Sequence, residues 1–147
     1  MINEEDVMDK MVEVIQDHLS EFLPETYTIT DDQVILDYPN VDKMAFDVCV
    51  YVAPQFSEME PSTTCSDSID FRLSVFILCK RDSQSNLTKK YFAYYNALYY
   101  LLRNYTTLDG FIDETKVLSV DFYPSVEANP NVRGAEISIS TKFEKDF

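Results

Sequence analysis

The sequence predicts an α+β domain with a mostly antiparallel sheet of about four to six strands and two main helices packed on one face. Two segments, near 4–23 and 87–105, have apolar residues at helical spacing, and several others alternate between apolar and polar residues. The helices interrupt runs of strands instead of following each strand in turn, which favours an antiparallel sheet. A length of 147 residues indicates a single domain spanning 1–147.

The first helix is expected from Glu4 to about Leu23, before Pro24. Acidic residues fill its first turn, where the helix dipole favours anions. His18 shares the apolar stripe of this helix. We interpret it as a packed or interface residue, because a metal ligand would need partners and the chain has no second histidine.

The following segments read as strands and connections. Short pieces at 27–30 and 34–36 predict a small hairpin or an irregular edge, and 45–53 predicts a strand with one buried face made by Phe46, Val48, Val50 and Val52. Two prolines and many hydroxyls in 54–68 predict a long loop. The clean alternation of 69–80 predicts a central strand.

The second helix is expected over 87–105, with Ser85 or Asn86 as its N-cap. Its main apolar stripe contains Leu87, Tyr91, Tyr94, Leu98, Leu101, Leu102 and Tyr105. A second stripe of Phe92, Tyr95 and Tyr99 widens the apolar arc to about half the circumference, whereas one sheet face needs a stripe of about 100°. The part of the apolar arc that one sheet face does not cover predicts a second packing partner for this helix. Phe92, Tyr95, Tyr99 and the exposed Tyr100 are therefore a candidate subunit interface.

Two strands close the chain. In 116–124 the residues Leu118, Val120 and Phe122 are expected to point inward, and in 135–144 alternate residues from Ala135 to Phe143 form one apolar face. The other face of the last strand is polar. That side of the sheet is expected to be solvated or to meet another copy of the protein.

Composition excludes several classes of protein. Twelve basic and 26 acidic side chains give a formal charge of −14, which disfavours sequence-specific binding of nucleic acid. An acidic N-terminus and the lack of any run of about 20 apolar residues indicate an intracellular protein without a membrane span. Cys49, Cys65 and Cys79 lack C-x-x-C spacing and are expected to be small buried apolar residues in a reducing compartment.

Catalytic chemistry is not indicated. The chain has one histidine and no G-x-S-x-G turn, and its two glycines cannot build a phosphate-binding loop. Glu58, Glu60, Asp67 and Asp70 surround the expected loop, and such a group is usually solvated and at best a weak cation site. We therefore predict no enzymatic activity, no cofactor and no metal.

The order of elements, the tyrosine-proline turn "DYPN" and the closing strand "AEISISTKFE" resemble the tail-terminator, or tail-completion, proteins of long-tailed bacteriophages and prophages. The resemblance implies a non-enzymatic ring, commonly a hexamer, that caps the tail tube, stops its polymerisation and joins it to the head connector. It also implies passive passage of DNA, assembly in the host cytoplasm and a final place in the virion.

Under this resemblance Glu58, Glu60 and Asp67 become candidate loop contacts or acids that face the ring lumen. The alternative is a bacterial α+β interaction or regulatory domain that binds a protein or a small ligand. The oligomeric state distinguishes the two, because a regulatory domain is expected to be monomeric or dimeric.

Overall fold

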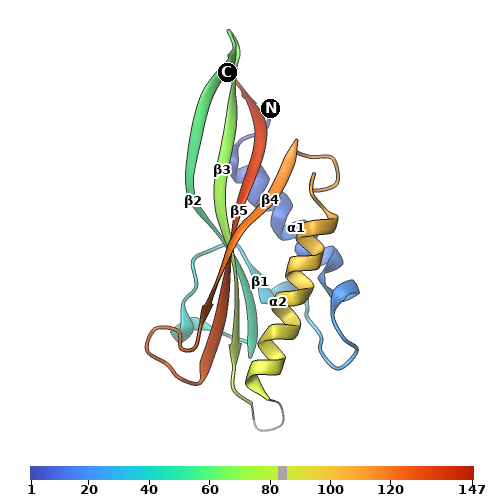
Figure 1. The fold of residues 1–147 in the computed structure, drawn as a ribbon, viewed down its shortest axis with the longest axis vertical. Coiled ribbons are helices and arrows are strands. Elements are labelled where there is room, and N and C mark those ends of the chain that lie inside the picture. Colours follow the sequence, from blue (N-terminus) through green and yellow to red (C-terminus); the bar gives the residue numbers. More distant parts are fainter. Residues whose placement is uncertain (83–85) are drawn as a thin grey trace.

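A five-stranded sheet with two helices on one of its faces forms the protein (Figure 1). The computed structural model describes residues 1–82 and 86–147. The helices are α1 (Glu4–Phe22) and α2 (Leu87–Asn104), with short 3-10 turns η1 (Asp31–Gln33) and η2 (Val41–Lys43). The strands are β1 (Val34–Ile35), β2 (Val48–Thr63), β3 (Ser66–Lys80), β4 (Glu114–Tyr123) and β5 (Val132–Asp146). The predicted α+β class is confirmed.

The strand order is β1-β2-β3-β5-β4. β1 pairs in parallel with β2 over two residues, and every other pair is antiparallel. Of the two options for the segment before β2, the irregular edge is therefore correct and the small hairpin is wrong. β4 forms one edge of the sheet. At the other edge β1 covers only Val50 and Tyr51 of β2.

The prediction of a loop over 54–68 is wrong. β2 continues to Thr63 and β3 begins at Ser66, so these residues form most of a long hairpin whose turn is Thr64–Cys65. The turn lies at one end of the molecule, close to both chain termini (Figure 1). The backbone N–H of Phe147 donates to the carbonyl of Cys65 at 2.9 Å, which ties the C-terminus to this tip.

Side-chain caps fix where the helices begin. Asn3 and Asp6 form a reciprocal capping box at the start of α1. The side chain of Asn86 accepts hydrogen bonds from the N–H groups of Thr88 and Lys89, so Asn86 is the N-cap of α2. The other candidate, Ser85, lies outside the described residues.

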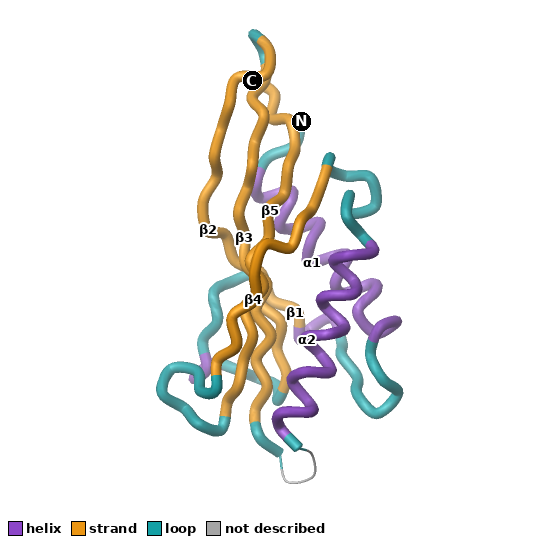
Figure 2. Tube along the Cα trace, in the orientation of Figure 1, coloured by secondary structure: helices purple, strands orange, loops and turns teal. Residues whose placement is uncertain are grey.

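The main core lies between the helices and one sheet face (Figures 1 and 2). Leu98, at the centre of the predicted stripe of α2, is fully buried. The other members of that stripe are also buried, except Tyr105, which is partly buried. Tyr94 satisfies its buried hydroxyl by donating to the carbonyl of Thr28 at 2.7 Å. The helices pack against each other as well as against the strands.

A smaller core on the opposite face corrects the expectation that 45–53 buries one side only. Cys49 and Tyr51, expected to lie on the less buried side, are 0% and 4% exposed. They pack with Val41, Met44, Leu78 and Val132. Phe46 precedes the strand and is 37% exposed. The half of the sheet nearer to α2's N-terminus is thus covered on both sides.

The expected inward set of β4 is partly wrong. The pairing of β4 with β5 shifts between Val117 and Ser119, so Leu118 is an extra residue in a bulge and is 42% exposed. Val117 and Val120 pack against the core in its place. Phe122 lies against α2 but at the sheet edge, and it is 44% exposed.

Candidate functional site

Five aromatic side chains on α2 and β4 form a continuous exposed surface, here called the aromatic surface: Phe92, Tyr95, Tyr99, Tyr100 and Phe122. The ring of Phe122 stacks on the ring of Phe92 with their centroids 5.3 Å apart, and it meets the ring of Tyr95 edge-on with their centroids 5.1 Å apart. The ring centroid of Tyr99 lies 6.3 Å from that of Tyr95 and 5.7 Å from that of Tyr100. The wide apolar arc of α2 therefore has β4 as a partial second partner.

β4 does not cover this surface fully. Phe92 remains 36% exposed, Phe122 44% and Tyr100 55%. Such a group of large side chains is typical of a protein contact, because monomers rarely expose contiguous aromatic clusters. The assignment of Phe92, Tyr95, Tyr99 and Tyr100 as a subunit interface stays a prediction. Sequence reasoning omitted Phe122 by placing it inside.

The aromatic surface lies on a basic helix in an acidic protein. α2 contains Lys89, Lys90 and Arg103 and no acidic residue. Lys90 is buried and paired with Asp82 at 2.9 Å, whereas Lys89 and Arg103 are exposed. The exposed charges of α2 are therefore basic, in contrast with the formal charge of −14 of the whole chain.

The three candidate acids do not form one group. Glu58 pairs with Asp70 across the hairpin and Glu60 pairs with Ser68, so both lie on the sheet face opposite the helices. With Lys142 they border a shallow concavity of about 210 Å³. Asp67 is an odd number of residues from Ser68 and Asp70 along β3, so its side chain points to the helix side of the sheet. The structure thus brings together Glu58, Glu60 and Asp70, and separates Asp67 from them.

Polar groups on this open face are tied to one another. Asp70 accepts from Arg72 at 3.2 and 3.3 Å and from the hydroxyl of Ser140. Burial alone would raise the pKa of the Asp70 carboxyl, but these hydrogen bonds outweigh it and keep the pKa below its ordinary value. Asp70 is therefore held as a carboxylate.

Glu136 links four strands further along the same face. It accepts from Tyr123 of β4 at 2.8 Å, from Ser74 of β3 at 2.8 Å and from Gln55 of β2 at 3.2 Å. The hydrogen bond to Glu136 and burial raise the pKa of Tyr123 to about 12. This network fixes the open face as a rigid polar surface.

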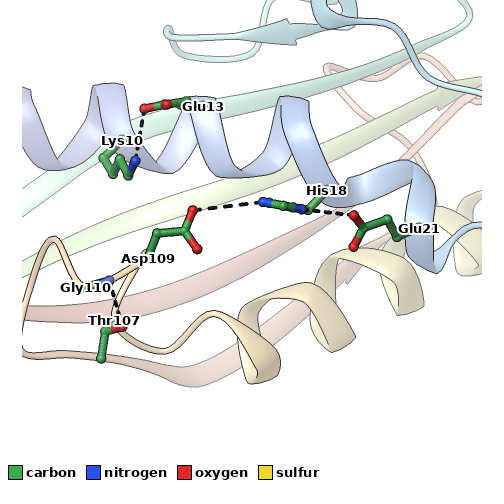
Figure 3. A network of polar contacts seen from close by, with 7 residues as sticks. All are labelled: Lys10, Glu13, His18, Glu21, Thr107, Asp109 and Gly110. Carbon is green, nitrogen blue, oxygen red and sulfur yellow. Dashed lines mark hydrogen bonds and ion pairs between the residues drawn. The ribbon is translucent and has the colours of Figure 1, made fainter.

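His18 is packed, as expected, at the junction of α1 with the turn after α2 (Figure 3). Its ring stacks on Tyr105 with centroids 4.4 Å apart. Nδ1 lies 3.1 Å from Glu21, and Nε2 lies 3.9 Å from Asp109. These contacts join the two helices, and the structure gives His18 a packing role.

A second exposed apolar region, here called the α1–β2 groove, was not found from the sequence. It has a volume of about 410 Å³. Its lining is Glu4, Glu5, Met8, Leu36, Pro54, Gln55, Phe56, Ser57 and Phe71. Leu36 is 42% exposed and Phe56 49%. The available signal was two apolar residues near acids and prolines: Leu36, in a segment predicted as a small hairpin or an irregular edge, and Phe56, in the predicted loop.

Within residues 1–82 and 86–147, no three histidine, cysteine or acidic side chains are grouped so that they could hold a metal ion. No helix in the same ranges has the length and apolar character required to cross a bilayer.

The two helices and the five-stranded sheet define an α+β domain with similar folds among solved structures. A chain from the virion of a native gene transfer agent particle aligns with a TM-score of 0.51 and 13% identity, over 89% of this chain and 95% of that chain. The sheath/tube terminator of an extracellular contractile injection system (PVC), in its extended state, aligns with a TM-score of 0.42 and 10% identity, over 94% of this chain and 57% of that chain.

The likeness to the gene transfer agent chain establishes a shared fold over nearly the whole of both chains. At this level of identity it says nothing about which residues act. No family model and no curated protein sequence matches this chain.

Proposed function

We propose that this chain is a non-enzymatic structural protein of a phage or prophage tail, of tail-terminator type. In this role it forms a ring, with a hexamer as the expected size, at the end of the tail tube, terminates the tube and joins it to the head. The observation that supports it most is the fold shared with a virion protein over 89% of this chain and 95% of the other. The element order and the motifs "DYPN" and "AEISISTKFE" support the same assignment.

The surfaces of the chain suit a ring subunit. An aromatic surface at the β4 edge offers apolar area for a neighbouring copy. The long β2–β3 hairpin extends to one end of the molecule, where it is placed to meet a tail-tube or head-connector protein (Figure 2). We place the protein in the host cytoplasm during assembly and in the virion afterwards.

The charge of the chain suits a channel for DNA. Glu58, Glu60 and Asp70 lie on the open sheet face, and the whole chain has a formal charge of −14. A lumen lined by acids repels phosphates, so that DNA slides without binding. We assign this open face to the lumen.

The test is assembly of the purified chain with a tail-tube protein from the same phage or prophage. We expect a ring by analytical ultracentrifugation and electron microscopy, either alone or on contact with tubes, and tubes that stop growing when it is added. Heat-unfolded chain is the control. A chain that stays monomeric or dimeric at high concentration and leaves tube growth unchanged would refute the proposal and favour an interaction or regulatory domain.

A further inference from the structure

Two exposed apolar surfaces lie at opposite edges of the one sheet. The aromatic surface is at the β4 edge, and the α1–β2 groove is at the edge formed by β1 and β2. We propose that these surfaces bind each other between successive copies, with the aromatic surface of one copy in the α1–β2 groove of the next. This inference rests on the ring assembly of the proposed function and adds its two contacting surfaces and its direction.

Charge complementarity indicates that the occupant of the groove is a second copy. α1, which forms one wall, has seven acids and one lysine, and Glu4 and Glu5 line the groove. The exposed Lys89 and Arg103 flank the aromatic surface on a helix without acids. The basic aromatic surface and the acidic apolar groove are therefore complementary in charge. Every copy of the chain has both, so that one copy can bind the next.

The chemistry of the side chains fits the same pairing. Met8, Leu36, Phe56 and Phe71 give the groove an apolar lining, to which Glu4 and Glu5 add carboxylates. Tyrosine has an apolar ring and a hydroxyl that donates to carboxylates, so it suits such a site. Tyr100, the most exposed residue of the aromatic surface, lies one helical turn from Arg103.

The open backbone edge of β2 gives an independent reason for a cover at this place. In the part of the chain that the structure describes, no strand pairs with the outer side of β2 beyond Tyr51. Phe56 and Met59, 49% and 56% exposed, stand on this uncovered stretch. Long edges with apolar side chains aggregate unless something covers them, and the neighbouring copy would do so.

Pairing of like surfaces is disfavoured. Two aromatic surfaces would bring Lys89 and Arg103 against their own copies, and two grooves would oppose Glu4 and Glu5 in the same way. Like charges across an interface are unfavourable. The contact is therefore head-to-tail, and a head-to-tail contact makes a ring when its rotation closes.

The test uses one variant for each surface. Tyr100→Glu/Arg103→Glu alters the aromatic surface, and Leu36→Glu/Phe56→Glu alters the groove, so that both altered surfaces are acidic and cannot pair with each other. All four residues are exposed, so both variants are expected to fold, which circular dichroism checks. Lys43→Glu/Phe46→Glu is the control, because it makes the same charge change as the first variant on exposed residues of the opposite sheet face.

We expect sedimentation of the wild type and the control to show the same large oligomer, and each surface variant alone to be monomeric. An equimolar mixture of the two variants should give a dimer and nothing larger, since one intact aromatic surface then meets one intact groove. A mixture that stays monomeric, a wild type that is monomeric at millimolar concentration, or a surface variant that keeps the wild-type size overturns the inference.

These results separate the inference from the proposed function. Rings that persist in both variants refute the head-to-tail contact and leave the tail-terminator role standing. A dimer in the mixture, together with a wild type that does not stop tube growth, supports the contact and refutes that role.

Discussion

At the scale of single residues, the three cysteines occupy different environments. Cys49 and Cys79 are completely buried, and burial raises the pKa of both thiols, that of Cys79 to about 12. Cys65 is exposed in the hairpin turn. The expectation that all three are buried is therefore wrong for Cys65. The sequence placed Cys65 in a loop but did not predict that it lies in the turn of a hairpin.

Thiol labelling should follow this difference. We expect a maleimide to modify one thiol of the native protein quickly and all three after denaturation, because the thiolate is the reactive form and needs access. Mass spectrometry counts the labels. Cys65→Ser should remove the fast label, and fast labelling of that variant would show that the strands around Cys49 or Cys79 open readily.

Glu4 joins the first turn of α1 to two strands. Its carboxylate accepts from Lys145 of β5 at 2.8 Å and from Ser57 of β2 at 3.0 Å. Burial alone would raise the pKa of Glu4, but the hydrogen bonds from Lys145, its own backbone N–H and Ser57 lower it below its ordinary value. A lowered pKa in the folded state means that the folded protein favours the ionised carboxylate.

This contribution should disappear in acid. It is fully present above the unfolded-state pKa of Glu4 and is lost as the pH falls through the lower, folded-state pKa. We expect Glu4→Gln to reduce the free energy of unfolding at pH 7 by about 1 kcal/mol, and the difference from wild type to shrink as the pH approaches 3. Urea unfolding at several pH values measures it. Exposed Glu5→Gln is the control, and an equal loss at every pH would contradict the linkage.

At the scale of elements, α2 has two sides with different roles. Leu98 is fully buried in the main core, while Tyr99 is a partly exposed member of the aromatic surface. We expect Leu98→Ala to lower the free energy of unfolding by about 2–5 kcal/mol, because it leaves a cavity. Tyr99→Ala should chiefly weaken self-association.

Chemical unfolding and sedimentation of the two variants measure this division. The adjacent positions in one helix make each variant the control of the other. Equal losses of stability with no change of oligomer size would show that both sides of α2 serve folding alone.

The helical spacing of apolar residues predicted the two helices. Alternation of apolar and polar residues predicted most strands, because a strand with one buried face buries every second residue. It failed at 54–68, where Pro54 and Pro61 and many hydroxyls are typical of a loop. Both prolines lie next to register shifts in β2, on a stretch whose outer side is uncovered. A proline without an N–H is tolerated in such edge and bulge positions, and local sequence does not report whether a strand is at an edge.

The candidate site shows the same limit. Helical periodicity alone identified Phe92, Tyr95, Tyr99 and Tyr100 as candidates. The width of an apolar arc can be obtained from the sequence of one helix, and this arc is wider than packing on one sheet face requires. The α1–β2 groove combines residues from α1, the segment after β1 and β2. No spacing within one element reveals a surface that tertiary packing assembles, and the same is true of the bulge that exposes Leu118.

At the scale of the whole molecule, charged residues are distributed unevenly, since α1 has seven acids and α2 has none. α2 is the basic element, and it supplies the surface proposed for the neighbouring copy. Glu58, Glu60 and Asp70 supply an acidic patch on the other side of the sheet. Under the proposed function, the first surface would attract another copy of the chain, and the second would repel the DNA that passes through the ring.

The position of the acids gives a test of that arrangement. We expect Glu58→Lys/Glu60→Lys to convert the open face into one that holds duplex DNA, with an affinity that falls steeply as salt rises because released counterions drive such binding. Fluorescence anisotropy of labelled duplex with the assembled oligomer, at about 50 and 200 mM salt, measures it. The wild type should not bind at either concentration.

Asp17→Lys/Asp32→Lys is the matched control. It makes the same change of charge on exposed residues of α1 and the turn after it, on the helix side of the sheet. If the open face lines a lumen, the Glu58/Glu60 variant should hold DNA far more tightly than this control, because a closed ring surrounds the duplex with every copy of the new lysines. Equal affinities for the two variants would mean that only net charge matters and would remove the open face from the lumen.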